Sequence, residues 1–198
     1  MYYIIGLGNP GAEYAATRHN IGWLMLDYMC TKYHVPTPLL DKSVSGRVSV
    51  GRMAGVDVSV LYPETFMNNS GSAVAKAVPG EAFPKMIVLY DDVDLPLGVV
   101  RIAYGRGDGG HNGLKSIIDK TGTRDFIRLR IGIAKKTLWP WQKEVIRRPA
   151  AGKPLERFVL GKFSKHELVQ LAEVQVQVEE ILGVVLQYGY VTAMNRYN

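Results

Sequence analysis

Polar side chains lie in short stretches with glycine or other small residues at several separate points of the sequence. They are Asn9 in GLGNPG, His19 and Asn20 in TRHNIG, Asn68 and Asn69 in TFMNNSG, and His111 and Asn112 in GDGGHNGLKS. Asp91 follows the apolar run MIVLY. A histidine beside a carboxylate is enough to activate a water molecule. Neutral amides can hold a peptide backbone or polarise an ester carbonyl without adding charge. This inventory predicts hydrolysis of an activated acyl bond.

Other chemistries find less support in the residues. No serine or cysteine stands in a nucleophile elbow, and no His, Cys and acid cluster has the spacing of a metal site. Cys30 is the only cysteine and falls in the apolar pattern of a helix, where a core thiol is expected. These residues therefore indicate neither a serine or cysteine nucleophile nor a metal site.

Strand and helix patterns alternate along the chain, and they must position these polar residues. We predict strands over 2–7, 45–53, 56–62, 86–90, 99–104 and 127–133, and helices over 21–33, 65–77, 110–120 and 164–188. Asn20 could cap the first helix, and Ser164 the last, with Glu167 completing a capping box. The order predicts an α/β fold: one domain over 1–198, with a mixed, mostly parallel, twisted sheet and helices on both faces. Strand ends and helix starts share a crevice in such sheets, so the polar segments can converge.

The first strand leads into Gly6-x-Gly8-x-x-Gly11, the spacing of a dinucleotide-binding turn. That turn needs a helix that begins inside the motif and an acid about 20 residues further on. Here the helical pattern starts only near Ile21, and 30–40 has no acid. We therefore interpret the stretch as a tight turn that presents Asn9.

Positive charge is concentrated in the second half of the chain. The net charge is +6 and the sequence pI about 9.4, and cations crowd the stretch from 101 to 165. A basic region suits phosphate binding, although a solvated face would look the same. Residues 135–158 read as a long basic loop or lid that carries Trp139 and Trp141. These tryptophans could stack on nucleotides, cover a core edge or make an oligomer contact.

The stretches GLGNPGAEYAATRHNIG, TFMNNSG, DDVDLPLG, GGHNGLKS and RLRIGI, in this order, and FVLGKFSKHE near the end, resemble bacterial-type peptidyl-tRNA hydrolase. The resemblance implies cleavage of the ester that joins a peptide to the tRNA 3′ ribose, which frees the tRNA for reuse. It implies no metal or nucleotide cofactor.

Carried over residue by residue, the resemblance implies that His19 is the general base and that Asp91 orients it. Asn9 and Asn68 would bind the peptide and position the carbonyl, and Asn112 would hold substrate or the attacking water. The resemblance also implies that the peptide channel is lined by Tyr14, Phe66 and Met67. It implies that the tRNA phosphates are contacted by Arg101 and Arg130.

The sequence departs from the family pattern at several positions. Tyr90 stands where a histidine is frequent, and Ala103 where a second basic residue is common. Arg106, in the glycine-rich stretch, could supply the missing tRNA contact. We expect His111 to have a structural role.

We expect peptidyl-tRNA to be bound by its acceptor stem and 3′ end, by a monomer. The N-terminus lacks a signal-peptide pattern, no apolar run approaches the ~20 residues that span a bilayer, and the single cysteine suits a reducing compartment. These observations favour the cytoplasm and no membrane contact. Alternatives are an RNA-binding protein on the same scaffold, a nucleotide-dependent oxidoreductase and a metal-dependent hydrolase.

Overall fold

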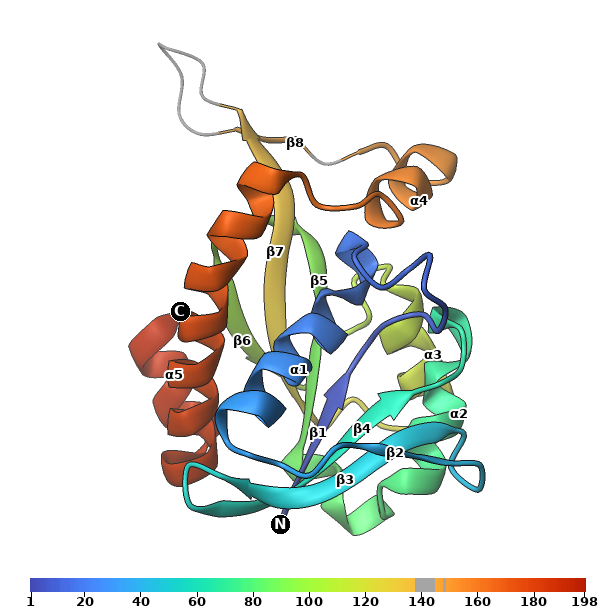
Figure 1. Cartoon of the computed structure of the whole chain (residues 1–198), viewed down its shortest axis with the longest axis vertical. Helices are drawn as coiled ribbons and strands as arrows, with labels where there is room; N and C mark the ends of the chain where they lie inside the picture. The colour runs from blue at the N-terminus through green and yellow to red at the C-terminus, as the bar shows by residue number, and fades with distance from the viewer. Residues whose placement is uncertain (138–144, 148) are drawn as a thin grey trace.

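The computed structural model describes residues 1–137, 145–147 and 149–198. Trp139 and Trp141, for which we expected contacts with nucleotides or with the core, lie outside the described residues. Figure 1 shows a central sheet with helices packed against it and with a short helix, α4 (Lys153–Val159), near the upper end of the sheet.

The sheet is parallel in its centre and antiparallel at both margins, as the α/β prediction requires. Its strand order is β2-β3-β4-β1-β5-β7-β6, and β8 pairs with β7. The strands are β1 Tyr2–Gly6, β2 Leu39–Asp41, β3 Gly46–Met53, β4 Val56–Pro63, β5 Met86–Pro96, β6 Val100–Tyr104, β7 Ile127–Thr137 and β8 Val145–Arg147. β1 runs parallel to β4 and β5, and β5 parallel to β7.

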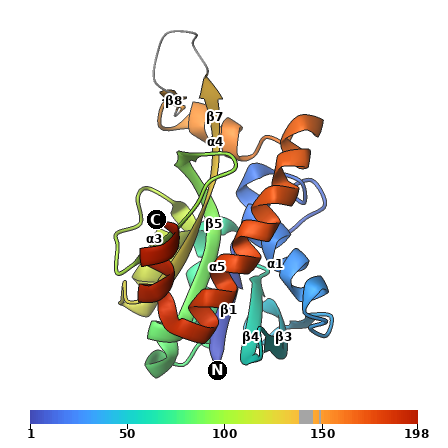
Figure 2. The same cartoon turned by 90° about the vertical axis from the view of Figure 1, so that its left-hand side faces the viewer.

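Helices cover the two faces of the sheet. They are η1 Arg18–Asn20, α1 Ile21–Lys32, η2 Met67–Asn69, α2 Ser70–Ala77, η3 Gly80–Lys85, α3 Asn112–Thr121, α4 Lys153–Val159 and α5 Lys165–Tyr197. Because successive side chains of a strand point to opposite faces, Ile4 joins the apolar cluster under α1 and α5, and Ile5 the cluster under α2 and α3. Figure 2 shows α5 and α3 on opposite sides of the strands. The predicted fold class is confirmed.

The glycines of the first turn have a packing role. A Cβ at Gly6 would lie 2.7 Å from the carbonyl oxygen of Gly22 in α1, and a Cβ at Gly8 would lie 2.7 Å from the ring of Trp23. Gly11 turns the chain with φ of 113°. Since α1 begins well after the motif, these glycines let a helix lie close to the strand and do not place a helix start at a phosphate.

The expectation of a loop over 135–158 is wrong in part. β7 continues to Thr137 and β8 pairs with it, and α4 begins at Lys153. Pro154 stands in the first turn of α4, where a missing N–H costs nothing. α5 also runs past the predicted end at 188, with a break at Gly189, where φ is 83° and ψ is 161°.

Candidate active site

A cleft of about 1510 Å³ lies beside the ends of β1 and β4, along β5 and β6, and under α4. Every residue for which we predicted a role in the site lines this cleft. They are Asn9, Tyr14, His19, Phe66, Met67, Asn68, Asp91, Arg101, Arg106, Asn112 and Arg130. The structure therefore brings them together, whereas their individual roles stay predictions.

A buried carboxylate with two histidines lies at the centre of the cleft. Asp91, in β5, is 3% exposed, and its Oδ1 lies 2.7 Å from His19 Nδ1 and 3.0 Å from His111 Nε2. His111 caps α3, since its Nδ1 accepts hydrogen bonds from the backbone N–H groups of Gly113 and Leu114. The structural role expected for His111 thus has a geometric basis, and the same side chain also contacts Asp91.

These partners determine which nitrogens carry protons. Because Nδ1 of His111 accepts two hydrogen bonds, its proton is on Nε2, which donates to Asp91. The carboxylate of Asp91 is therefore an acceptor for both rings, and Nδ1 of His19 donates to it. That leaves the lone pair of His19 on Nε2, the form that a general base requires.

The charges at this centre shift two pKa values. Burial alone would raise the pKa of Asp91, but the two histidines hold it well below its usual range. Burial alone would lower the pKa of His19, but the charge of Asp91 and its hydrogen bond outweigh this, so the pKa of His19 lies above its ordinary value. Asp91 therefore stays ionised and makes His19 a stronger base.

Asn9 is held with its amide in one orientation. Its Oδ1 accepts a hydrogen bond from the backbone N–H of Met67 at 2.7 Å. Its backbone N–H donates to Oδ1 of Asn20, and its carbonyl accepts from Nδ2 of Asn20, both at 3.0 Å. With its oxygen occupied, Asn9 presents its NH₂ donor to the cleft.

Asn20 is therefore not the helix cap that its position suggested. It makes no side-chain cap to α1 and is instead fully buried against the backbone of Asn9. Sequence reasoning weighed only its local neighbours, and this partner lies 11 residues away.

The two ends of the cleft differ in character. At one end Tyr14 and Phe66 meet edge to face with ring centroids 6.4 Å apart, and Phe66 is exposed. At the other end Arg101 and Arg130 are directly opposite on β6 and β7, and Arg130 donates to Asp92 at 2.8 Å. The cleft therefore has an aromatic end beside β4 and β1 and a cationic end at β7 and β6, and Asp91 in β5 lies between them.

Sequence reasoning missed the role of Arg128. This side chain is 1% exposed, and its guanidinium donates to the backbone carbonyls of Arg106 and Gly107. It shares one face of β7 with Arg130, and the alternation in RLRIGI could have indicated that. Arg128 therefore holds the glycine-rich segment that presents Arg106 to the cleft.

A second buried arginine connects α4 and α5 to the segment that carries His19. The guanidinium of Arg18 donates to Glu167 at 2.9 and 3.0 Å and lies over the rings of Phe158 and Phe163. Glu167 also completes the predicted capping box with Ser164, which is confirmed.

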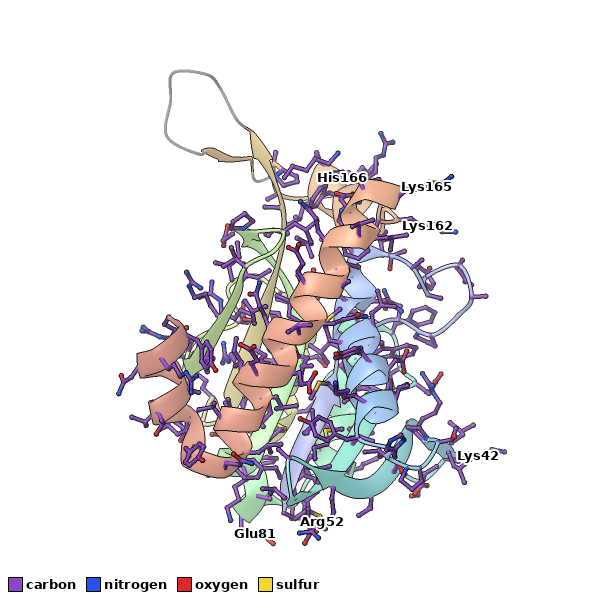
Figure 3. The ribbon with its side chains drawn as sticks, turned by 60° about the vertical axis from the view of Figure 1, so that its left-hand side comes forward. Lys42, Arg52, Glu81, Lys162, Lys165 and His166 are labelled. Atoms are coloured by element: carbon purple, nitrogen blue, oxygen red, sulfur yellow. The ribbon has the colours of Figure 1, made fainter. Side chains whose placement is uncertain are left out.

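Further basic residues lie near this junction. Figure 3 shows Lys162, Lys165 and His166 together at the start of α5, whereas Arg52 and Glu81 lie at the opposite end of the molecule. Positive charge is therefore also found at the end of the molecule that carries α4.

Comparison with known proteins gives a consistent result. Residues 3–198 match the family described as Peptidyl-tRNA hydrolase. The chain belongs to the peptidyl-tRNA hydrolase family. It is 42% identical to the peptidyl-tRNA hydrolase of Syntrophotalea carbinolica, over all of this chain and 97% of that protein. The corresponding protein of Caldanaerobacter subterraneus subsp. tengcongensis is 40% identical over the whole of both chains.

Solved structures agree with this assignment. The crystal structure of peptidyl-tRNA hydrolase from Acinetobacter baumannii is similar with a TM-score of 0.82 and 33% identity, and the match covers all of this chain and 94% of that one. The family resemblance and the ester hydrolase class are thus confirmed. Among the described residues, no helix is long and apolar enough to cross a membrane.

Proposed function

We propose that this cleft hydrolyses the ester between the peptide and the 3′ ribose of peptidyl-tRNA, with His19 as the general base. The observation that carries the proposal is the buried contact of 2.7 Å between His19 Nδ1 and Asp91 Oδ1, in a cleft that also holds the donor of Asn9. Family membership supports the substrate, and the geometry supports the roles.

The proposed reaction needs one water molecule and no co-reactant. His19 Nε2 takes a proton from the water, and the water oxygen bonds to the carbonyl carbon of the ester. The NH₂ of Asn9 donates to the carbonyl oxygen as negative charge develops there. The bond to the ribose oxygen then breaks, and His19 returns its proton to that oxygen. Asp91 stabilises the imidazolium between these steps, and Asn112 orients water or substrate.

The ends of the cleft account for the two halves of the substrate. Tyr14, Phe66, Met67 and Asn68 receive the peptide. Arg101, Arg106 and Arg130 contact phosphates at the acceptor stem and 3′ end of the tRNA. Guanidinium groups suit phosphate because they donate in a planar fork. We further propose that the protein acts as a monomer in the cytoplasm.

The experiment is release of free tRNA from an N-blocked aminoacyl-tRNA in the presence of a chelator. Wild type should release tRNA, and His19→Ala should lose about 10²–10⁴-fold in kcat, the usual contribution of a general base. His166→Ala is the matched control, because His166 is exposed at the start of α5 and outside the cleft. A His19→Ala variant that stays folded and as active as His166→Ala would refute the role of His19.

Two outcomes would favour the alternatives. A wild type that binds tRNA without releasing it would indicate a binding protein on this scaffold. Loss of activity with chelator would indicate a metal, since ligand atoms of His19, Asp91 and His111 lie within 4.8 Å of one another. We favour the metal-free reaction because the same atoms already bond to each other and to the start of α3.

A further inference from the structure

The last part of α5 turns back along the edge of the sheet. The helix is interrupted at Gly189, whose φ of 83° few other residues adopt. Beyond the break, the ring of Tyr190 stacks on that of Tyr104 in β6 with centroids 4.4 Å apart, and Ala193 is fully buried. Figure 1 shows this final segment next to β6. The segment 190–198 is thus docked on β6.

Asn198 ends this docking with a paired contact. Its Oδ1 accepts a hydrogen bond from the backbone N–H of Ile102, and its Nδ2 donates to the carbonyl oxygen of Ile102, both at 2.9 Å. β6 is the last strand of the sheet order, so this edge would otherwise expose unpaired backbone groups. One carboxamide takes the place of a neighbouring strand at this residue.

The paired contact lies directly beside Arg101. Nη1 of Arg101 donates to the carbonyl oxygen of Tyr197 at 3.3 Å and to that of Val100 at 3.1 Å. Holding Asn198 on the strand therefore also holds the Tyr197 carbonyl against Arg101. Met194 and Asn198 line the same cleft as Arg101.

Arg101 needs such support because its neighbour repels it. Arg101 and Arg130 are directly opposite on adjacent strands, where like charges are destabilising. Arg130 has the carboxylate of Asp92 at 2.8 Å, whereas Arg101 donates to carbonyl oxygens of the described chain. The positive charge of Arg101 therefore remains available to an anion in the cleft.

We propose that Asn198 is a positioning residue for substrate binding, which acts through Tyr197 to hold Arg101 toward the polynucleotide part of the substrate. The segment 190–198 then forms the wall of the cleft beside the tRNA end. This inference rests on the proposed function, because it assigns Arg101 to a phosphate. It goes beyond that function in giving the final turn of the chain a part in affinity.

The test compares Asn198→Ala, Arg101→Ala and the double variant on two substrates. One is an N-blocked aminoacyl-tRNA, and the other is the same N-blocked amino acid esterified to adenosine alone. Asn195→Ala is the matched control, because Asn195 is exposed on the same turn. KM, kcat and the dependence of KM on salt are measured for each, together with the thermal midpoint.

Asn198→Ala should raise KM for the tRNA substrate about three- to tenfold, as expected when a hydrogen-bonded support is lost. It should leave kcat, and both constants for the adenosine ester, within about twofold of the Asn195→Ala control, since the chemical centre is untouched. The slope of log KM against log salt concentration should become shallower and approach that of Arg101→Ala. In Arg101→Ala the loss of one phosphate contact should reduce this slope by about 0.9. The double variant should have the same KM for the tRNA substrate as Arg101→Ala, because Asn198 acts only through Arg101.

Three results would overturn the proposal. They are an unchanged KM and salt slope in Asn198→Ala, equal losses on both substrates, and additive effects in the double variant. If Asn198→Ala lowers the thermal midpoint without changing KM, Asn198 stabilises the edge strand β6 and has no part in substrate binding. An inactive wild type would refute the proposed function instead, and the dissociation constants of the same variants for deacylated tRNA would then decide this inference separately.

Discussion

Replacing Asp91 by Asn should isolate the charge of the catalytic centre from its geometry. The two side chains have the same shape, and the amide oxygen can still accept from both histidines. In many sites the amide could turn and offer NH₂ to the base. Here His111 prevents that, because its Nδ1 is occupied by the start of α3 and its Nε2–H needs an acceptor. The variant should therefore keep the tautomer of His19 and lose only the negative charge.

The size of the effect follows from the contact. A distance of 2.7 Å between His19 Nδ1 and Asp91 Oδ1 places the charge centres of the two groups close together. Unit charges about 4 Å apart attract by about 4 kcal/mol at an effective dielectric constant of about 20. This attraction stabilises the imidazolium that forms during the reaction. Since about 1.4 kcal/mol changes a rate tenfold, Asp91→Asn should lower kcat by up to about 10³-fold.

The pH profile gives a second, independent readout. The rate needs neutral His19, so kcat/KM falls on the acid side as His19 becomes protonated. In the wild type Asp91 raises the pKa of His19 against the opposing effect of burial. In Asp91→Asn the hydrogen bond remains but the charge is lost, and burial then favours the neutral ring. The acid limb should therefore move to lower pH while the maximum rate falls.

The assay is tRNA release from an N-blocked aminoacyl-tRNA across the pH range, with circular dichroism as a check on folding. Asp119→Asn, on the exposed side of α3, is the control for removal of a carboxylate. A kcat within fivefold of wild type would refute the argument. So would an acid limb that stays in place or moves to higher pH.

Three further predictions concern the support of the site. His111→Ala should lower kcat, and the lost cap should lower the free energy of unfolding by about 0.5–2 kcal/mol, measured by urea unfolding. His111→Asn should restore the stability, because asparagine can cap a helix, but it should not restore the contact with Asp91. Arg106→Ala should raise KM for peptidyl-tRNA and flatten its salt dependence, and an unchanged salt slope would remove Arg106 from the phosphate contacts. Gly8→Ala should destabilise the fold by about 1–3 kcal/mol in the same urea assay, because the new methyl would meet the ring of Trp23 at 2.7 Å.

Sequence patterns predicted the elements that carry strong periodicity. The strands of the central sheet are apolar runs, and the helices begin near residues with clear capping chemistry, as Ser164 and Glu167 illustrate. The short strands β2 and β8 were not predicted, because neither has enough residues to show the alternation of a strand. α4 was not predicted because Pro154 suggested a loop, although proline is well tolerated in the first turn of a helix.

The candidate residues could also be gathered from sequence, but not their orientation. Asn20 looked like a helix cap because capping is a local rule, whereas its actual partner is the backbone of Asn9 across a turn. The burial of Arg128 depends on the path of the glycine-rich segment, which Gly105, Gly109 and Gly110 turn with positive φ. Such contacts depend on how segments meet in space, and no single segment contains that information.

The start of α3 influences the reactive groups, although it does not itself contain the base. Two backbone N–H groups there, of Gly113 and Leu114, hold Nδ1 of His111, and through Asp91 they determine that the lone pair of His19 is on Nε2. Within this series, a substitution that keeps an acceptor toward both rings, such as Asp91→Asn, leaves the proton of His19 in place, whereas loss of the His111 ring removes that constraint.

The same helix start also bears on the donor for the carbonyl. A Cβ at Gly113 would lie 2.6 Å from the sulfur of Met67, so α3 packs directly on the segment whose backbone N–H holds Oδ1 of Asn9. His19 and Asn9 are thus both held in place by contacts with the start of α3, so the packing of this helix determines the distance between them. A change at Gly113 should therefore impair His19 and Asn9 together, an outcome that separate supports for the two groups would not produce.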